Sequence, residues 1–449
     1  MALKGLDIYK NLPRENCKEC GVPTCLAFAM KVAAGQAKLE DCPRLSKEAQ
    51  AELSEASAPP QRLVKLGADP HPIELGQETV LFRHEEKFHH PTAVALRLSD
   101  AAGEEEIKKA CSAFLKLQFT RVGQVLKPEM IALVNESQSP DKFRAAAQII
   151  RGALGVPMVL MSDSAETLGI VSKALFSGCR PLLYCTGNAS VEALAALRKE
   201  TGSPLCVAGS LESVAERVKA LADKGVKDVI ISAGAVSLSE ALVFSTQTRR
   251  AALGKKFRPL GCPVLAMACG EDKAASALDA CVHVSKYAAV VVSDAWEPHL
   301  LLPILTARQN IYTDPQKPVQ MVPGLYDVGE VTQESPLLVT TNFSLSYYSV
   351  EGEVESSRIP CRILAVDTEG TSVLTAWAAD KFNSETITAA LKKFAAAEKV
   401  NHNKLVLPGH VAVIAATLAE DSGWKVLVGP REASGIGPFL KNSWKKDGL

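Results

Sequence analysis

Four cysteines near the N-terminus are the residues of this chain best suited to chemistry. Cys17, Cys20, Cys25 and Cys42 follow the spacing C-x2-C-x4-C-x16-C. Four thiolates in one short segment can close a single soft-metal site, and an iron–sulfur cluster is the natural occupant. The last cysteine precedes a proline, as in bacterial cluster-binding sequences. The spacing therefore predicts an iron–sulfur cluster with these four cysteines as its ligands.

A helix is expected to position the third of these cysteines. Pro23 suits the start of a helix over residues 24–34, which places Cys25 in the first turn, where the helix dipole favours a thiolate. Gly35 ends this helix, and a second helix is expected over 46–53. Structural zinc is the alternative metal, although zinc sites usually carry two separated C-x2-C pairs and this segment has one. Thiols without a ligand are the third interpretation.

The composition bounds the remaining possibilities. A chain of 449 residues exceeds what one core usually holds, so two or three domains are expected. Lys+Arg and Asp+Glu are equal at 50 each, so no net field attracts nucleic acid or an anionic membrane. No signal peptide or membrane-spanning apolar run is evident. The cysteines outside the motif lack ligand spacing and are expected to be buried thiols of a cytoplasmic protein.

Residues 93–312 alternate short apolar runs with longer amphipathic segments. Continuous apolar strands that alternate with helices are typical of a parallel sheet covered by helices. Eight such units over this length predict a (β/α)8 TIM barrel, and an open doubly wound sheet is the alternative. The strands are expected at residues 93–98, 130–134, 158–161, 182–185, 205–208, 229–231, 264–268 and 289–292. The preceding segment, 58–92, is predicted to be a connector containing a hairpin.

Polar residues follow these strands, where barrel enzymes place their chemistry. Asn135, Glu136, Asp163 and Asp294 are examples. Asp and Asn suit the donor–acceptor edge of a small polar ligand such as a pterin. Small polar residues also simply turn a chain from strand to helix, which is the other interpretation.

The C-terminal part returns to α/β alternation after a segment rich in Pro and Gly. We expect a linker over 313–334 and a compact open-sheet domain over 335–449, whose ligands would lie beyond the carboxyl ends of the strands. The strands are expected at residues 337–340, 361–366, 404–407 and 425–428.

Loops of small residues follow these four strands. Gly370, Thr371 and Ser372 precede a predicted helix and offer backbone N–H groups and hydroxyls to a phosphate. In the last loop, glycines allow the backbone to approach a bulky flat ligand, and Ala433 adds no obstruction. Helix caps and ordinary turns are the alternative. The convergence of four such loops on one sheet edge indicates a nucleotide-like cofactor site.

The cysteine motif, the barrel and the α/β tail together resemble the large subunit of the corrinoid iron–sulfur protein, a family of the reductive acetyl-CoA pathway of anaerobes. The resemblance covers essentially the whole length. It implies an α/β protein with a [4Fe–4S] domain over 1–57, a linker over 58–92, a TIM barrel over 93–312, a linker over 313–334 and a corrinoid-binding domain over 335–449.

The resemblance also implies a function as a methyl-carrying subunit rather than an independent enzyme. A cobalamin-type corrinoid would lie between the C-terminal domain and a smaller barrel subunit. It would accept methyl from methyltetrahydrofolate through a methyltransferase and deliver it to acetyl-CoA synthase, while the cluster restores Co(I) from Co(II). The resemblance implies no catalytic residue in this chain. The implied corrinoid contacts are Thr340, Gly370, Thr371, Ser372, Val373 and Ala433.

Many corrinoid carriers bind cobalt from below through the histidine of a D-x-H-x-x-G loop, and none of the eight histidines here lies in that pattern. We therefore predict that no protein nitrogen lies below the cobalt. Two other classes of function remain open: a pterin-dependent methyltransferase whose barrel does the chemistry, and an iron–sulfur electron-transfer subunit whose tail binds a flavin or dinucleotide. Against the second, no G-x-G-x-x-G follows a predicted strand.

Overall fold

The computed structural model describes residues 5–33, 36–46, 59–68 and 72–444. The N-terminal part is a small helical body whose buried side chains include Ile8, Phe28 and two cysteines of the motif. Its elements are α1 (Gly5–Lys10), α2 (Cys25–Ala33) and the 3-10 helix η1 (Leu39–Asp41). The helix predicted over 24–34 is confirmed as α2. The helix predicted over 46–53 lies outside the described residues, except for its first position.

The connector contains the expected hairpin. Strands β1 (Leu63–Leu66) and β2 (Ile73–Gly76) pair antiparallel. The end of the connector is fixed by Arg83, whose Nε donates to the carbonyl of Ile311 at 2.9 Å. The described part of the connector therefore bonds to the rest of the fold and is not only a spacer.

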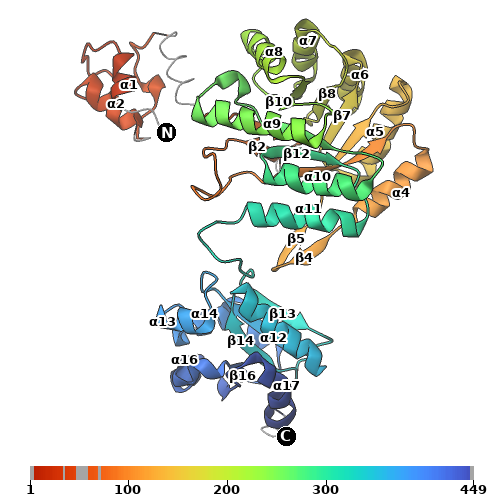
Figure 1. Cartoon of the computed structure of the whole chain (residues 1–449). Helices are drawn as coiled ribbons and strands as arrows, with labels where there is room; N and C mark the ends of the chain where they lie inside the picture. The colour runs from red at the N-terminus through yellow and green to blue at the C-terminus, as the bar shows by residue number, and fades with distance from the viewer. Residues whose placement is uncertain (1–4, 34–35, 47–58, 69–71, 445–449) are drawn as a thin grey trace. The chain divides into compact units, whose positions relative to one another are not determined.

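Eight parallel strands close a barrel in the described part of the chain (Figure 1). In their order around the barrel they are β3 (Ala93–Ser99), β6 (Met130–Val134), β7 (Met158–Ser162), β8 (Leu182–Cys185), β9 (Leu205–Ala208), β10 (Val229–Ser232), β11 (Val264–Ala268) and β12 (Ala288–Ser293). The side chains of β7, β8, β10 and β12 are buried along the full strand. Burial on both faces explains their continuous apolar sequences. The prediction of a closed barrel is confirmed.

Helices cover the outside of the barrel, and serines begin several of them. The helices are α4 (Glu104–Phe114), α5 (Pro140–Leu154), α6 (Ala165–Leu175), α7 (Val191–Thr201), α8 (Leu211–Asp223), α9 (Leu238–Arg249), α10 (Lys273–Ser285) and α11 (Pro298–Ile311). The serine hydroxyls that cap them by accepting a backbone N–H are those of Ser139, Ser164, Ser190, Ser210 and Ser237. Much of the polar sequence after the barrel strands therefore serves helix capping.

Additions to the barrel were not foreseen. A hairpin of β4 (Phe119–Arg121) and β5 (Gln124–Leu126) lies between α4 and β6. Its turn has positive φ at Val122 (48°) and Gly123 (72°), as in a type I′ hairpin turn. A π-helix, η2 (Arg250–Gly254), and a 3-10 helix, η3 (Arg258–Leu260), separate α9 from β11.

The C-terminal part is a five-stranded open sheet in the order β13-β15-β14-β16-β17. Its strands are β13 (Gly324–Val328), β14 (Leu337–Thr341), β15 (Cys361–Val366), β16 (Lys404–Leu407) and β17 (Lys425–Val428). Strands β14 to β17 are parallel, as predicted, and β13 pairs antiparallel with β15 at the edge. Because β13 lies within the segment predicted as a linker, residues 324–328 of that segment belong to the sheet. The domain limits themselves stay predictions.

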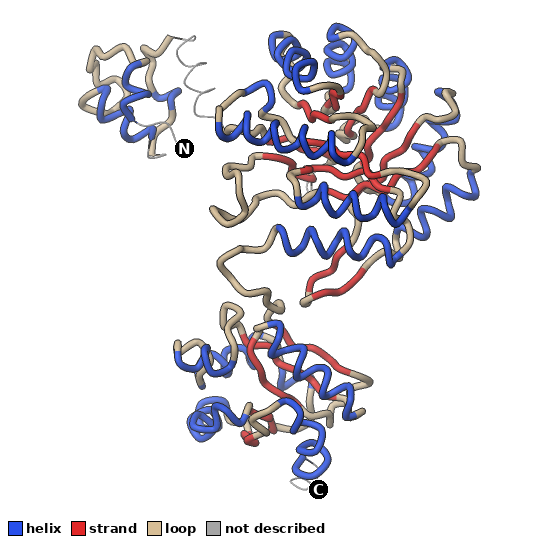
Figure 2. Tube along the Cα trace, in the orientation of Figure 1, coloured by secondary structure: helices blue, strands red, loops and turns tan. Residues whose placement is uncertain are grey.

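Helices cover both faces of this sheet (Figure 2). They are α12 (Ser344–Ser357), α13 (Val373–Ala378), α14 (Ser384–Lys393), α15 (Ala396–Lys399), η4 (Gly409–Ile414), α16 (Ala415–Ser422), η5 (Ala433–Gly435), α17 (Ile436–Phe439) and η6 (Leu440–Trp444). Tyr347 and Val354 of α12 belong to one apolar core, and Ile387 and Leu391 of α14 belong to the other. A sheet covered on both faces leaves its strand ends as the place for a ligand.

Candidate cofactor sites

The four cysteines of the N-terminal motif lie in one small body. Cys25 and Cys42 are 8% and 9% exposed, whereas Cys17 and Cys20 are half-buried. Cys25 is the first residue of α2, and its backbone N–H donates to Oδ1 of Asn16 at 2.8 Å. This bond folds the loop with the first two cysteines back onto the helix N-terminus.

The surroundings of Cys42 disfavour a thiolate that has no positively charged partner such as a metal. Burial raises the pKa of Cys42, and the other three cysteines of the motif add to this shift because they lie nearby. Near Cys42, Arg44 forms an ion pair with Glu15 at 2.6 Å and another with Glu19. Among the described residues, no group of His, Cys, Asp and Glu is arranged to hold a metal ion. Analysis of the bound metal therefore decides between a cluster and zinc.

A pocket of about 420 Å³ lies at the carboxyl ends of the C-terminal strands. Four of the predicted contacts line it: Thr340 on β14, Ser372 and Val373 at the start of α13, and Ala433 in η5. Leu345 on the rim is 66% exposed, although it is apolar. An exposed apolar rim around small residues favours a bulky ligand that covers it.

The other two predicted contacts, Gly370 and Thr371, do not line the pocket. The hydroxyl of Thr371 donates to the carbonyl of Thr368 at 2.7 Å, and Gly370 is turned inward with φ at 71°. The structure therefore places these residues behind the pocket wall, where they shape the loop that presents Ser372.

Asn342, whose role the sequence did not indicate, organises this loop. Its side chain is fully buried, and its Oδ1 accepts from the N–H of Thr368 at 2.9 Å and the N–H of Gly370 at 3.1 Å. Its Nδ2 donates to Oε1 of Gln320 at 2.9 Å and to the carbonyl of Met321 at 3.3 Å. Backbone groups have fixed polarity, so these partners fix the orientation of the amide.

Further lining residues come from elements that the sequence analysis missed or interpreted otherwise. Helix α12 contributes Leu345, Ser346 and Ser349 to the pocket. His410, in η4, also lines it, and its Nε2 lies 3.8 Å from Oε1 of Glu432. The position of His410 directly after a strand was the available signal, and the structure places this histidine in the lining of the strand-end pocket.

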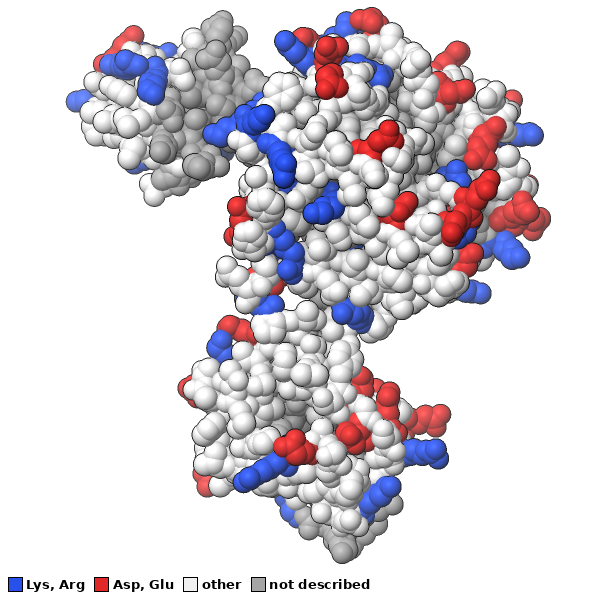
Figure 3. Space-filling model, viewed as in Figure 1, with Lys and Arg blue, Asp and Glu red and all other residues white. Residues whose placement is uncertain are grey.

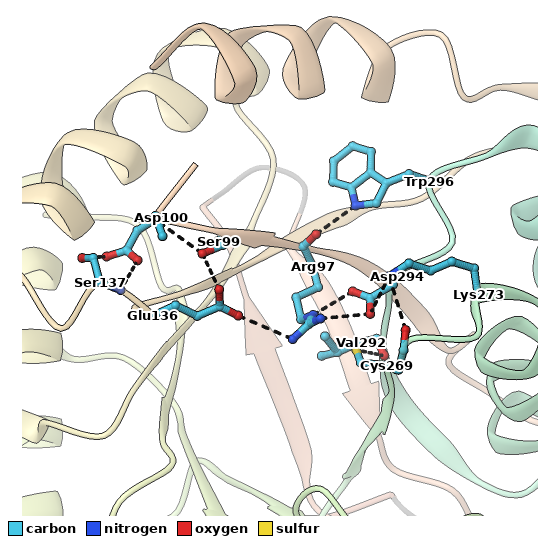
Figure 4. Close-up of polar contacts among 12 residues, drawn as sticks. Arg97, Ser99, Asp100, Glu136, Ser137, Cys269, Lys273, Val292, Asp294 and Trp296 are labelled. Atoms are coloured by element: carbon cyan, nitrogen blue, oxygen red, sulfur yellow. Dashed lines mark hydrogen bonds and ion pairs between the residues drawn. The ribbon is translucent and has the colours of Figure 1, made fainter. Parts of the chain in front are cut away.

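Charged side chains fill the mouth of the barrel (Figure 4). Arg97 of β3 binds Asp294 with both ends of its guanidinium, Nε to Oδ1 at 2.7 Å and Nη2 to Oδ2 at 3.0 Å. Nζ of Lys273 approaches the same carboxylate at 3.4 Å, and Nη1 of Arg97 lies 3.7 Å from Glu136. Hydrogen bonding to Asp294, with Glu136 adding to it, raises the pKa of Arg97.

This network uses two of the strand-end residues that the sequence offered as ligand contacts, Glu136 and Asp294. Asp294 is only 6% exposed and is neutralised from two sides. Arg97 was not foreseen, because it lies within an apolar run that reads as a strand. The geometry favours the structural interpretation of these residues, since their charges are paired with one another.

Charges of both signs are interspersed over the surface that Figure 3 shows, in keeping with equal numbers of acidic and basic residues. Among the described residues, no helix combines the length and apolar character needed to span a membrane.

Comparison with protein families gives two matches. Residues 63–440 match the family described as CO dehydrogenase/acetyl-CoA synthase delta subunit, and residues 12–44 match a family described as a putative Fe–S cluster. The second match contains all four cysteines of the motif. The fold and the sites thus define an α/β protein with a barrel, a cysteine-rich N-terminal body and a C-terminal pocket domain.

Curated relatives align over almost the whole chain. The corrinoid/iron–sulfur protein large subunit of Moorella thermoacetica is 45% identical over 98% of this chain and 99% of its own length. Subunit gamma of the acetyl-CoA decarbonylase/synthase complex of Methanothermobacter thermautotrophicus is 32% identical over 98% and 99%. The chain belongs to the family of corrinoid/iron–sulfur protein large subunits.

Among solved structures, a dihydropteroate synthase from Coxiella burnetii in complex with pteroic acid aligns with 56% of this chain and 100% of its own. The TM-score is 0.40 and the identity 11%, so the similarity carries no argument about a ligand of this barrel.

Proposed function

We propose that this chain is a methyl-carrying corrinoid subunit of the acetyl-CoA pathway, with an iron–sulfur cluster that keeps its corrinoid active. One observation carries the proposal: a four-cysteine body and an open strand-end pocket occur in one chain that is 45% identical, over 98% of its length, to a corrinoid/iron–sulfur protein large subunit. When bound, the corrinoid supplies a cobalt nucleophile that takes up methyl, and a [4Fe–4S] cluster supplies a low-potential electron to restore the reduced cobalt.

The residues of this chain bind and position these groups. Cys17, Cys20, Cys25 and Cys42 would hold the cluster. Thr340, Ser372, Val373 and Ala433 would contact the corrinoid directly, whereas Gly370 and Thr371 would hold the loop behind them. The side chains of Thr340, Ser372, Val373 and Ala433 are small, which allows a flat macrocycle to approach the pocket wall closely.

The pocket also bears on partners. A corrinoid is too large to be enclosed in about 420 Å³, so this chain would cover only part of it. The remaining surface is available to a second subunit, which we propose is a smaller barrel subunit. The methyl donor system would be a methyltetrahydrofolate methyltransferase, and the acceptor acetyl-CoA synthase. A cytoplasmic location and the absence of nucleic-acid and membrane partners stay predictions.

Metal analysis tests the proposal. The chain is purified without oxygen, with the smaller subunit co-expressed, and iron, cobalt and zinc are measured together with the absorbance spectrum. We expect about four iron atoms and one cobalt per chain. Zinc without iron would refute the cluster. Folate binding without cobalt would favour the pterin-dependent methyltransferase, and a bound flavin or dinucleotide the electron-transfer subunit.

A further inference from the structure

The turn of the β4–β5 hairpin is seated in the C-terminal domain. Val122 at its tip is 4% exposed and shares an apolar core with residues of that domain. Its N–H donates to Oη of Tyr348 at 3.0 Å, and its carbonyl accepts from the N–H of Val322 at 3.1 Å. The neighbouring Gly123 has no room for a side chain, since a Cβ there would collide with Oη of Tyr326.

The segment that receives the turn continues directly to Asn342. Next to Val322, the N–H of Met321 donates to the carbonyl of Asn342 at 2.7 Å. The side-chain amide of Asn342 returns bonds to Met321 and to Gln320. Gln320 also packs closely against Gly370 of the pocket loop. A Cβ added to Gly370 would lie only 3.1 Å from the Cβ of Gln320.

From Asn342 the contacts lead to the pocket wall. Its Oδ1 is shared by three donors, the N–H and hydroxyl of Thr368 and the N–H of Gly370. Two residues further along, Ser372 and Val373 line the pocket. An unbroken series of bonds therefore joins the barrel hairpin to the wall of the candidate corrinoid site.

We propose that Asn342 is a positioning residue that couples the seating of the β4–β5 turn to the shape of the corrinoid pocket. A buried amide with all its partners satisfied has few alternative arrangements, because each lost bond leaves a buried polar group unpaired. Displacement of Val322 and Met321 would therefore disturb the bonds that Asn342 makes to Thr368 and Gly370. A second contact reinforces the coupling, since Tyr348 is adjacent to the pocket-lining Ser349 on α12.

The inference rests on the proposed corrinoid function and has a reciprocal consequence. If seating of the turn favours the corrinoid-binding shape, the corrinoid must favour seating of the turn to the same extent. Both effects are measurable in equilibrium without any methyl transfer.

The first test unseats the turn. Gly123→Ala places a methyl group against Tyr326, whereas Gly155→Ala, the control, adds the same methyl group at a similar positive φ of 62° with nothing within 4 Å. The full chain with its smaller subunit is titrated with hydroxocobalamin. We expect the Kd to rise about threefold to tenfold in Gly123→Ala relative to Gly155→Ala. Equal Kd values in the two variants would overturn the inference.

The second test asks whether Asn342 carries the effect. Asn342→Asp keeps an oxygen for Thr368 and Gly370 but sets a carboxylate oxygen against the carbonyl of Met321. In this background Gly123→Ala should add less than about twofold to the Kd, because the link is already cut. Full additivity of the two substitutions would show that Asn342 does not transmit the seating.

A third measurement serves if Asn342→Asp does not fold. Amide hydrogen exchange of residues 367–372 should be faster in Gly123→Ala than in Gly155→Ala, since the bonds of Asn342 to this loop weaken. Unchanged exchange would overturn the coupling. If the wild-type assembly binds no hydroxocobalamin, the proposed function falls as well, whereas binding with no difference between the variants removes the coupling alone.

Discussion

The barrel mouth and the edge of the C-terminal sheet share one arrangement of strands and loops but differ in how their side chains occupy the space beyond the strands. In both, parallel strands end in loops of small and polar residues. At the barrel mouth, Arg97 reaches out of β3 and binds Asp294 and Glu136. At the C-terminal edge, β14 ends in two threonines and Asn342, whose side chain bonds inward and leaves a pocket open.

We infer from this comparison that the length of the strand-end side chains influences whether such an edge leaves space for a ligand. A guanidinium is long enough to bridge to neighbouring loops and to be neutralised by them. Threonine and asparagine are too short for that, so the space beyond them stays available. Composition of the loops alone does not distinguish the two cases, since both edges contain Ser, Asn, Asp and Gly.

The largest effect should follow from removing a group held for a ligand. Cys25→Ser should lower the iron content, or raise its sensitivity to oxygen, at least about tenfold, because a thiolate ligand is lost. The control Cys179→Ser removes a half-buried barrel thiol outside the motif and should leave iron unchanged. Iron and acid-labile sulfide analysis of anaerobic protein provides the measurement. Equal iron loss in both variants would contradict the ligand assignment.

A large side chain in the pocket of the C-terminal sheet should prevent corrinoid binding. Ala433→Trp places a large ring in the pocket, and we expect cobalt retention by the purified assembly to fall about tenfold or more. Glu136→Gln changes a residue of the barrel mouth that is not a predicted cofactor contact, and it should leave cobalt unchanged. Cobalt loss in Glu136→Gln, with retention in Ala433→Trp, would reverse the comparison.

Substitutions at the barrel mouth should lower the free energy of unfolding and leave the cobalt content unchanged. Asp294→Asn leaves Arg97 and Lys273 without their buried carboxylate, and we expect a loss of about 1–3 kcal/mol in the free energy of unfolding. Glu136 is 46% exposed, so Glu136→Gln should cost less than about 1 kcal/mol. Urea unfolding measures both. A fall in cobalt content of Asp294→Asn would show that the barrel mouth takes part in corrinoid binding.

The smallest effect concerns His410. We predict no protein nitrogen below the cobalt, although His410 lines the pocket. Electron paramagnetic resonance of the Co(II) form of the assembly should show no splitting from an axial nitrogen, and His410→Ala should leave the spectrum unchanged. A splitting that disappears in His410→Ala would identify the ligand that this prediction excludes.

The sequence predicted the elements that are buried on both faces. The eight barrel strands and β14, β15 and β16 are largely buried apolar runs because helices and the core cover them, whereas β17 was predicted although it is half-exposed or exposed along its length. The cysteine motif was also readable, because its four cysteines happen to lie within one short segment. Four of the six corrinoid contacts that the resemblance implied and that were assigned by loop position line the pocket, namely Thr340, Ser372, Val373 and Ala433.

What the sequence did not show depends on one-sided or long-range contacts. Strand β13 is half-exposed along most of its length and lies among Pro and Gly residues, so it lacks a strand pattern. Helix α12 contains Gly352 and places apolar and polar residues around its whole circumference. The role of Asn342 depends on Gln320 and Gly370, which lie 22 and 28 positions away along the chain. No local pattern reports such partners.

The incorporation of β13 into the sheet limits the reach of the tether between barrel and C-terminal domain. Only residues 312–323 separate α11 from β13, so this segment would span at most roughly 40 Å even if it were released and fully extended. A tether this short holds the C-terminal domain at a local concentration in roughly the millimolar range around the barrel. At such a concentration the turn at Val122 meets its seat often, so the bonds to Tyr348 and Val322 can re-form readily after the domain has moved away.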